Sequence, residues 1–338
     1  MEGLGEYLES HQKYPWQKLG YPEETGHIDV TEITSDSSKA ELSTRKLTAR
    51  EVRPWLTSIA RNRQGQFCIV WISTSVRDSQ ISCNISMADQ ESIVNDFGLY
   101  RARQLAASRG FICSPAENQR NSGKQHISLN TLRFDLLWRY DHSTSTTNAI
   151  CWTDDDDDFL SVMDAPGALK TMAGLSKHPM FIALVMASCI SQDVEREIGF
   201  NADRISSVEN RTRHTSYIYE EDEVAEGSFS TLSAMMSGCA TALAELERDC
   251  DIVRDVLEPL RQTRWPKGED PPQWKQSLAE EVLECANVLE QRLKAHVSRI
   301  QYFERIANIQ LTAVSRSRPT SNNGEILDRQ KFIIIDPN

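Results

Sequence analysis

One helical pattern near the C-terminal end of the sequence constrains this chain more than any other feature. Between Leu278 and Val314, apolar residues recur every three or four positions, which is the spacing of an amphipathic α-helix. The stripe consists of Leu278, Val282, Cys285, Leu289, Leu293, Val297, Ile300, Phe303, Ala307, Leu311 and Val314. No Gly or Pro interrupts these 37 residues. At a rise of about 1.5 Å per residue the helix would extend for roughly 55 Å. A helix of this length needs a partner for its apolar face.

The pattern stops at a cluster of Ser, Pro, Asn and Gly between Ser315 and Gly324, which is typical of a loop. The sequence therefore predicts a stalk helix over 276–314 and an irregular tail over 315–338.

Composition limits the classes of partner. The net charge of −12 disfavours nucleic acid, because binding a phosphate backbone requires a basic surface. The eight cysteines include no C-x-x-C pair and most lie in apolar runs, which is typical of reduced, buried thiols in a cytoplasmic protein. We therefore expect a cytoplasmic chain that does not bind nucleic acid.

The sequence predicts no membrane span within this chain. Its longest unbroken apolar run covers 180–187, whereas a helix that crosses a bilayer needs about 20 such residues. The N-terminal residues are acidic and contain no apolar segment of the kind found in secretory signals.

The chain divides into four predicted regions. Residues 1–50 are rich in Ser, Thr and charge, and we expect them to be partly disordered. Residues 51–164 form a small α/β domain, residues 165–314 form a helical domain with the stalk helix, and the tail follows. The fold class is thus α+β and mostly α: a small mixed domain followed by a helical domain that ends in a long stalk helix.

Residue patterns place the elements within these regions. Strands are indicated by β-branched and aromatic content, and helices by the three-to-four-residue period. The expected strands are 66–74, 131–141 and 148–154, with the last two joined as a hairpin. The expected helices are 92–111, 166–176, 179–213, 228–263 and 273–316.

A run of five aspartates is the only candidate metal site in the sequence. Asp154, Asp155, Asp156, Asp157 and Asp158 offer the oxygen ligands that Mg²⁺ and Ca²⁺ prefer. The run lacks the alternating ligands, the Gly turn and the closing Glu of a calcium loop, so a solvated loop or helix N-terminus is the simpler interpretation. We retain the run as a candidate for weak Mg²⁺ binding.

The familiar signatures of enzymes are absent from the sequence. The seven histidines show no H-x-H or H-x-x-x-H spacing, and the motifs Gly-x-Ser-x-Gly, Gly-x-x-x-x-Gly-Lys and Gly-x-Gly-x-x-Gly do not occur. We expect no enzyme activity, and we name no catalytic or cofactor-binding residue. An enzyme of unknown type remains the third-ranked alternative.

Three segments of the helical region carry a resemblance to a known family. The segments "HPMFIALVMASCISQDVEREI", "ISSVENRTRHTSY" and "RIQYFERIANIQLTAV" resemble the extramembrane region of fungal CorA-like magnesium transporters. The resemblance covers about residues 50–314. It implies an α/β cytoplasmic domain, then helices, then a long stalk that leads into two membrane spans.

The sequence departs from that family after Val314. The family continues its stalk into a membrane span and carries a Gly-Met-Asn motif at the pore, and this chain contains no Gly-Met-Asn. The expected protein is a CorA-like domain truncated before the pore, non-conducting alone, and at most regulatory or oligomerising. Residues 315–338 would then be an unrelated tail.

Two kinds of partner are compatible with the stalk. The resemblance implies a homo-oligomer, a pentamer in this family, or association with full-length family members. We expect the stripe to form a weak intermolecular seam that Leu289→Asp or Ile300→Asp would disrupt. The alternative is a soluble coiled-coil scaffold or interaction protein unrelated to ion transport.

Overall fold

The computed structural model describes residues 27–36, 39–60, 67–77, 80–105, 110–113, 123–131, 134–154, 164–212, 228–262 and 273–316. The chain divides into two compact units, and each of its three long helices contributes to both. The first unit combines the residues up to 194 with 249–294, and the second combines 195–248 with those from 295 onward.

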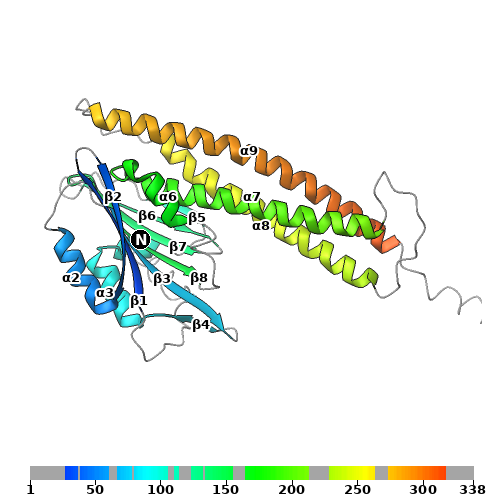
Figure 1. Cartoon of the computed structure of the whole chain (residues 1–338), viewed down its shortest axis with the longest axis horizontal. Coiled ribbons are helices and arrows are strands. Elements are labelled where there is room, and N and C mark those ends of the chain that lie inside the picture. Colours follow the sequence, from blue (N-terminus) through cyan, green and yellow to red (C-terminus); the bar gives the residue numbers. More distant parts are fainter. Residues whose placement is uncertain are drawn as a thin grey trace, which may run out of the picture. The chain divides into compact units, whose positions relative to one another are not determined.

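An eight-stranded mixed sheet forms the centre of the first unit (Figure 1). Its strands are β1 His27–Asp36, β2 Lys39–Thr48, β3 Phe67–Arg77, β4 Gln80–Cys83, β5 Gly110–Cys113, β6 Lys124–Asn130, β7 Phe134–Asp141 and β8 Thr146–Asp154. Seven strands follow the order β2-β1-β3-β8-β7-β6-β5, and β4 pairs with β3. The pair β3 and β8 is parallel, and the other pairs in the described residues are antiparallel.

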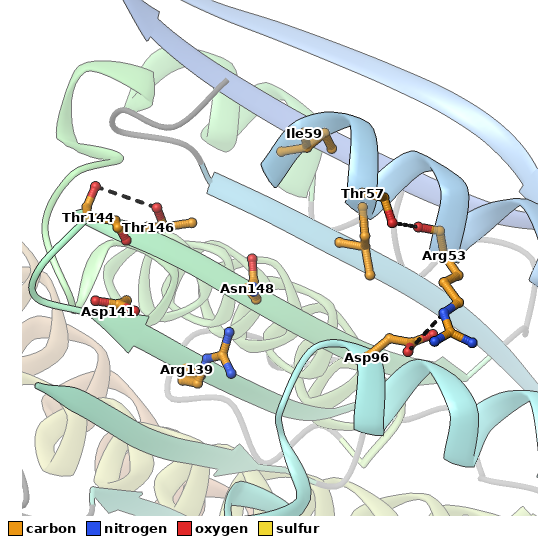
Figure 2. A pocket seen from close by; sticks show the side chains of 10 residues that line it. Arg53, Thr57, Ile59, Asp96, Arg139, Asp141, Thr144, Thr146 and Asn148 are labelled. Carbon is orange, nitrogen blue, oxygen red and sulfur yellow. Dashed lines mark hydrogen bonds and ion pairs between the residues drawn. The ribbon is translucent and has the colours of Figure 1, made fainter. Parts of the chain in front are cut away.

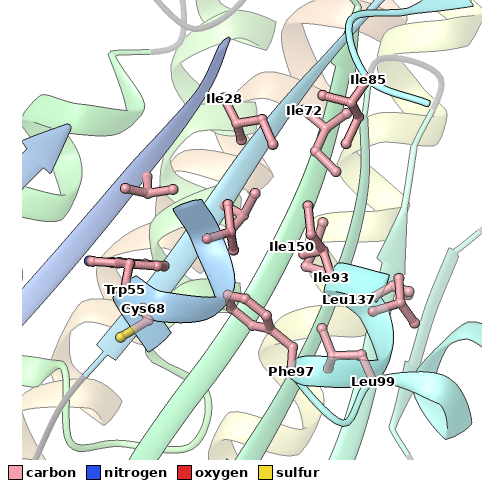
Figure 3. Close-up of a cluster of buried hydrophobic side chains, with 14 of the residues drawn as sticks. Ile28, Trp55, Cys68, Ile72, Ile85, Ile93, Phe97, Leu99, Leu137 and Ile150 are labelled. Carbon is pink, nitrogen blue, oxygen red and sulfur yellow. The ribbon is translucent and has the colours of Figure 1, made fainter. Parts of the chain in front are cut away.

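Three helices cover one face of this sheet: α2 Ala49–Ala60, α3 Met87–Asp96 and α4 Tyr100–Leu105. Side chains from the central strands, among them Ile72 and Ile150, pack there against Trp55 of α2 and Phe97 at the end of α3 (Figure 3). The strand residues that face these helices alternate with residues that face the opposite side, as the pleat of a strand requires. This face therefore holds an apolar core of its own.

The opposite face of the sheet is covered by the chain that leads into the helical region. The elements there are α6 Ala165–Thr171, the 3₁₀-helix η2 Ala173–Leu175 and the first turns of α7 Phe181–Thr212. The buried Trp138 donates a hydrogen bond from Nε1 to the carbonyl of Pro179 at 3.1 Å. Its neighbour on the same face, Tyr140, donates from its hydroxyl to the carbonyl of Lys177 at 2.9 Å. These two bonds hold the start of α7 against β7.

The second unit consists of three helical segments, from α7, α8 Ser228–Gln262 and α9 Gln273–Arg316. Glu195 of α7 pairs with Arg299 of α9, and fourteen residues further along α7 Glu209 meets Gln310 of α9 at 3.5 Å. Both contacts advance in the same direction, so α7 and α9 are parallel, and α8 returns between them in the chain. The apolar faces of the three segments are buried against one another.

The predicted fold class is confirmed: a mixed α/β part precedes a helical part that ends in a 44-residue helix. Four of the five predicted helices are confirmed to within a few residues: they correspond to α6 with η2, to α7, to α8 and to α9. Strands β7 and β8 form the predicted hairpin. Among the described residues after Asp164 every regular element is helical.

Two predictions about the N-terminal half are wrong. Partial disorder was expected over 1–50, but residues 27–36 and 39–48 form strands β1 and β2, which pair along ten positions. Residues 1–26 and 37–38 lie outside the described part. The helix expected over 92–111 is instead α3 and α4 with a break at Gly98, whose φ of +67° ends the first helix, and strand β5 begins at Gly110. The predicted tail beyond Arg316 also lies outside the described residues.

Candidate functional site

The aspartate run is only partly within the described structure. Asp154 is the last residue of β8, and Asp155, Asp156, Asp157 and Asp158 lie outside the described residues. Elsewhere in the described ranges, no group of three or more His, Cys, Asp or Glu side chains is arranged to hold a metal ion. Weak Mg²⁺ binding by the run therefore stays a prediction.

The apolar stripe of α9 is buried within its own chain. Leu289 is 5% exposed and Ile300 is fully buried, and the same holds for most of the stripe. The prediction that this stripe forms an intermolecular seam is corrected on this point, because most of its side chains are already buried within the chain. The three-to-four-residue period marks a buried face and does not say which chain covers that face.

A second apolar series on α9 is exposed instead. In the second unit Tyr302 is 57% exposed and Ile309 is 62% exposed, and they follow the exposed Ala295 at intervals of seven residues. Val288, which belongs to the first unit and is 52% exposed, continues the interval in the sequence. Seven-residue spacing is the repeat of a coiled-coil position. The polar residues Ser298, Arg305 and Thr312 alternate with this series, so the exposed face is only thinly apolar.

Among the described helices, none contains an apolar stretch of the length that spanning a bilayer would require.

A pocket of about 400 Å³ opens in the first unit between α2, the end of α3 and strands β7 and β8 (Figure 2). It lies on the face of the sheet that the helices α2 and α3 cover. Its lining combines apolar side chains from α2 with charged and polar side chains from the sheet. The lining residues are Arg53, Leu56, Thr57, Ile59, Asp96, Arg139, Asp141, Thr144, Thr146 and Asn148.

Two arginines and two aspartates supply the charges of this pocket. Arg53, whose side chain is 76% exposed, pairs with Asp96 through Nε at 3.6 Å. Asp141 accepts a hydrogen bond from the backbone N–H of Ser143 at 2.9 Å and another from the Ser143 hydroxyl. Burial alone would raise the pKa of Asp141, but these hydrogen bonds outweigh it and hold the pKa below its usual value.

Arg139 is the charged residue of the pocket whose side chain has the fewest hydrogen-bond and ion-pair partners among the described residues. Its guanidinium is half-buried, and this burial lowers its pKa from the usual value, although the charge of Asp141 acts in the opposite direction. In the described part of the chain, its guanidinium makes no hydrogen bond or ion pair. Figure 2 shows Arg139 and Asn148 pointing into the same space from adjacent strands, which agrees with their pairing in the sheet.

The loop after α3 is shaped around this guanidinium. A Cβ atom on Gly98 would overlap Nη1 of Arg139, and the positive φ of Gly98 also favours glycine. The side chain of Arg139 is thus flanked by backbone on one side and by the pocket on the other.

Sequence reasoning did not identify this pocket. The signal it carried is the position of Arg139 in "LLWRYD", where strand alternation places the arginine on the same face as the buried Leu137. A charged residue on the covered face of a strand needs either a partner or a ligand.

No protein-family model matches this chain, and no curated protein matches it.

Proposed function

We propose that this chain is the extramembrane domain of a CorA-like divalent-cation transporter, with a regulatory or oligomerising role, and that it is not an enzyme. The observation that carries the proposal is the combination on α9 of a buried stripe and an exposed seven-residue series. The buried stripe attaches α9 to its own chain, and the exposed series leaves a second face for another copy.

The order of the elements supports the same proposal. A mixed sheet covered by helices on both faces is followed by two long helices and then by the 44-residue α9. This is the order that the resemblance implies for the cytoplasmic part of the family. Divalent cations, Mg²⁺ first, are the ligands that this function would involve.

The proposed assembly is a homo-oligomer whose copies meet along the exposed series of α9. Tyr302 and Ile309 would lie at its centre, where an aromatic and a β-branched side chain bury apolar area against the same residues of the next copy. The neighbouring positions Ser298, Arg305 and Thr312 add little apolar area, so we expect a weak association that depends on concentration.

Sedimentation velocity over a wide range of protein concentration tests this proposal. Wild type should shift to larger species as concentration rises, and Tyr302→Asp and Ile309→Asp should remain monomeric. Ala244→Asp is the matched control, because Ala244 is an exposed apolar residue on α8 in the same unit. Repeating the series with Mg²⁺ and with a chelator would show whether the cation changes the assembly.

A chain that remains monomeric at every concentration would contradict this proposal. That result would favour the alternative that α9 pairs with a different protein, as in a coiled-coil scaffold unrelated to ion transport. Association that Ala244→Asp weakens as much as Ile309→Asp would show that another surface is responsible.

A further inference from the structure

The pocket between α2, α3, β7 and β8 has a charge arrangement that no contact within the protein completes. Arg53 and Asp96 form a pair, and Asp141 is held by the turn that follows it. Arg139 remains, half-buried and with no hydrogen bond or ion pair to its guanidinium in the described residues. A half-buried charge has lost part of its hydration, so a ligand of opposite charge is favoured beside it.

We propose that this pocket binds a small organic monocarboxylate, whose carboxylate pairs with the guanidinium of Arg139. An arginine presents a planar pair of N–H donors that matches the two oxygens of a carboxylate. Asn148 points into the same space from β8, and its side-chain amide can bond a polar group on the ligand (Figure 2).

The remaining lining defines the rest of the ligand. Leu56 and the buried Ile59 close the side of the pocket formed by α2, so a short apolar chain fits there. The volume of about 400 Å³ lies within the range of sites for small molecules.

The charge of the lining selects against a phosphate. Two arginines and two aspartates line the pocket, so the formal charge of the four groups is zero, although only Arg53 and Asp96 form an ion pair. A dianion would bring its second negative charge beside these carboxylates, and like charges at short range repel. A single negative charge needs only Arg139.

Isothermal titration with sodium butyrate, acetate and inorganic phosphate tests the proposal on the full chain. Butyrate should bind saturably and more tightly than acetate, because its propyl chain reaches the apolar side formed by α2, and phosphate should bind at least tenfold more weakly than butyrate. Amide signals of Gly98 and Asn148 in a nitrogen-edited NMR spectrum should move with butyrate. These two residues border the guanidinium and the pocket, so their shifts locate the ligand.

Arg139→Gln should weaken butyrate binding at least tenfold. The affinity of Arg139→Lys should lie between those of Arg139→Gln and wild type, because lysine keeps the charge and loses the paired donors. Arg53→Gln is the matched control, since it removes an arginine of the same pocket that is already paired and largely exposed. Circular dichroism establishes that each variant is folded, and a folded Arg139→Lys keeps the test valid where Arg139→Gln does not fold.

Three results would overturn the proposal. The first is the absence of saturable butyrate binding below about 10 mM, a concentration at which a site with a binding free energy of about −4 kcal/mol would already be occupied. The second is equal butyrate binding by wild type and Arg139→Gln. The third is phosphate binding as tight as butyrate binding. The last result would identify an anion site without selection for carboxylates.

Discussion

Two Asp substitutions two positions apart on α9 should differ greatly in their cost to stability. Ile300 is fully buried in the second unit, whereas Tyr302 is 57% exposed. Replacing Ile300 with Asp removes a buried side chain that contributes about 1.5 to 3 kcal/mol. It also places a carboxyl group in a fully buried position, at a cost of roughly 1 to 3 kcal/mol when the group is neutral and more when it is charged.

The expected loss for Ile300→Asp is therefore about 4 kcal/mol or more, a large share of the 5 to 15 kcal/mol that stabilises a typical domain. Tyr302→Asp should stay within about 0.5 kcal/mol of wild type, because exposed positions tolerate such changes. Ile300→Val, which removes one methylene and keeps the site apolar, should cost only about 1 kcal/mol.

Urea unfolding followed by circular dichroism measures these differences. The measurement belongs at a protein concentration where sedimentation shows a monomer, so that loss of assembly does not contribute to the midpoint. A wild-type midpoint for Ile300→Asp would refute the reasoning, since it would mean that α7 and α8 do not cover the stripe. An Ile300→Asp chain that is stable but no longer associates would restore the stripe as an intermolecular seam.

Three further predictions concern the first unit. Tyr140→Phe should lower stability by about 1 kcal/mol in urea unfolding, because the partly buried carbonyl of Lys177 loses its donor. Burial lowers the pKa of His178 to about 4 from 6.5, so the contribution of the neutral imidazole to stability is complete above the unfolded value and declines as pH falls toward 4. Between pH 7 and pH 5 wild type should lose about 2 kcal/mol that His178→Gln retains, and equal losses in both would contradict this account. Gly98→Ala should cost about 1 kcal/mol or more through its positive φ and its overlap with Arg139, and the cost should shrink without vanishing in an Arg139→Ala background.

The long helices were predictable because their signal is local. Residues three and four positions apart share a face, so the stripe of α9 and the apolar run that opens α7 are visible without knowledge of their partners. The boundary of α7 with the preceding turn was predictable too, since Pro179 fits the start of a helix and cannot continue one.

The β1–β2 hairpin was not predicted because it is rich in Thr, Ser and charged residues, a composition that is also typical of disordered segments. Thr31 and Thr44 face each other across the two strands, with their hydroxyl oxygens 3.3 Å apart. Threonine favours a strand because it is β-branched, but in a sequence it counts as a polar residue. The exposed Arg45 and Lys46 belong to an edge strand, where charge discourages pairing with another chain. Ile28 and Val30 carried the correct alternation, but two apolar residues were too few to outweigh the polar ones.

The pocket could not be predicted, because it depends on which segments the topology brings together. Arg53 and Asp96 come from separate helices, and Arg139 and Asn148 come from strands whose pairing register aligns them. The positions of these residues in the sequence do not indicate that they lie close together in the fold. The sequence offered only the anomaly of Arg139 among buried neighbours, which indicates a need for a partner without naming one.

In the proposed assembly, one face of α9 serves folding and the other serves the contact between copies. If the main apolar stripe of a helix were buried only by a second copy, the monomer would expose a large apolar surface. Folding would then depend on protein concentration. Here the stripe is covered within the chain, so the monomer can fold before it meets a second copy. Stable protein interfaces bury about 1,200 to 2,000 Å², which a series as thin as Ala295, Tyr302 and Ile309 does not supply on one helix. Assembly by this face should therefore stay reversible near the concentrations at which it begins. A reversible contact can be strengthened or weakened by a bound cation, whereas an obligate one would hold the copies together regardless of it.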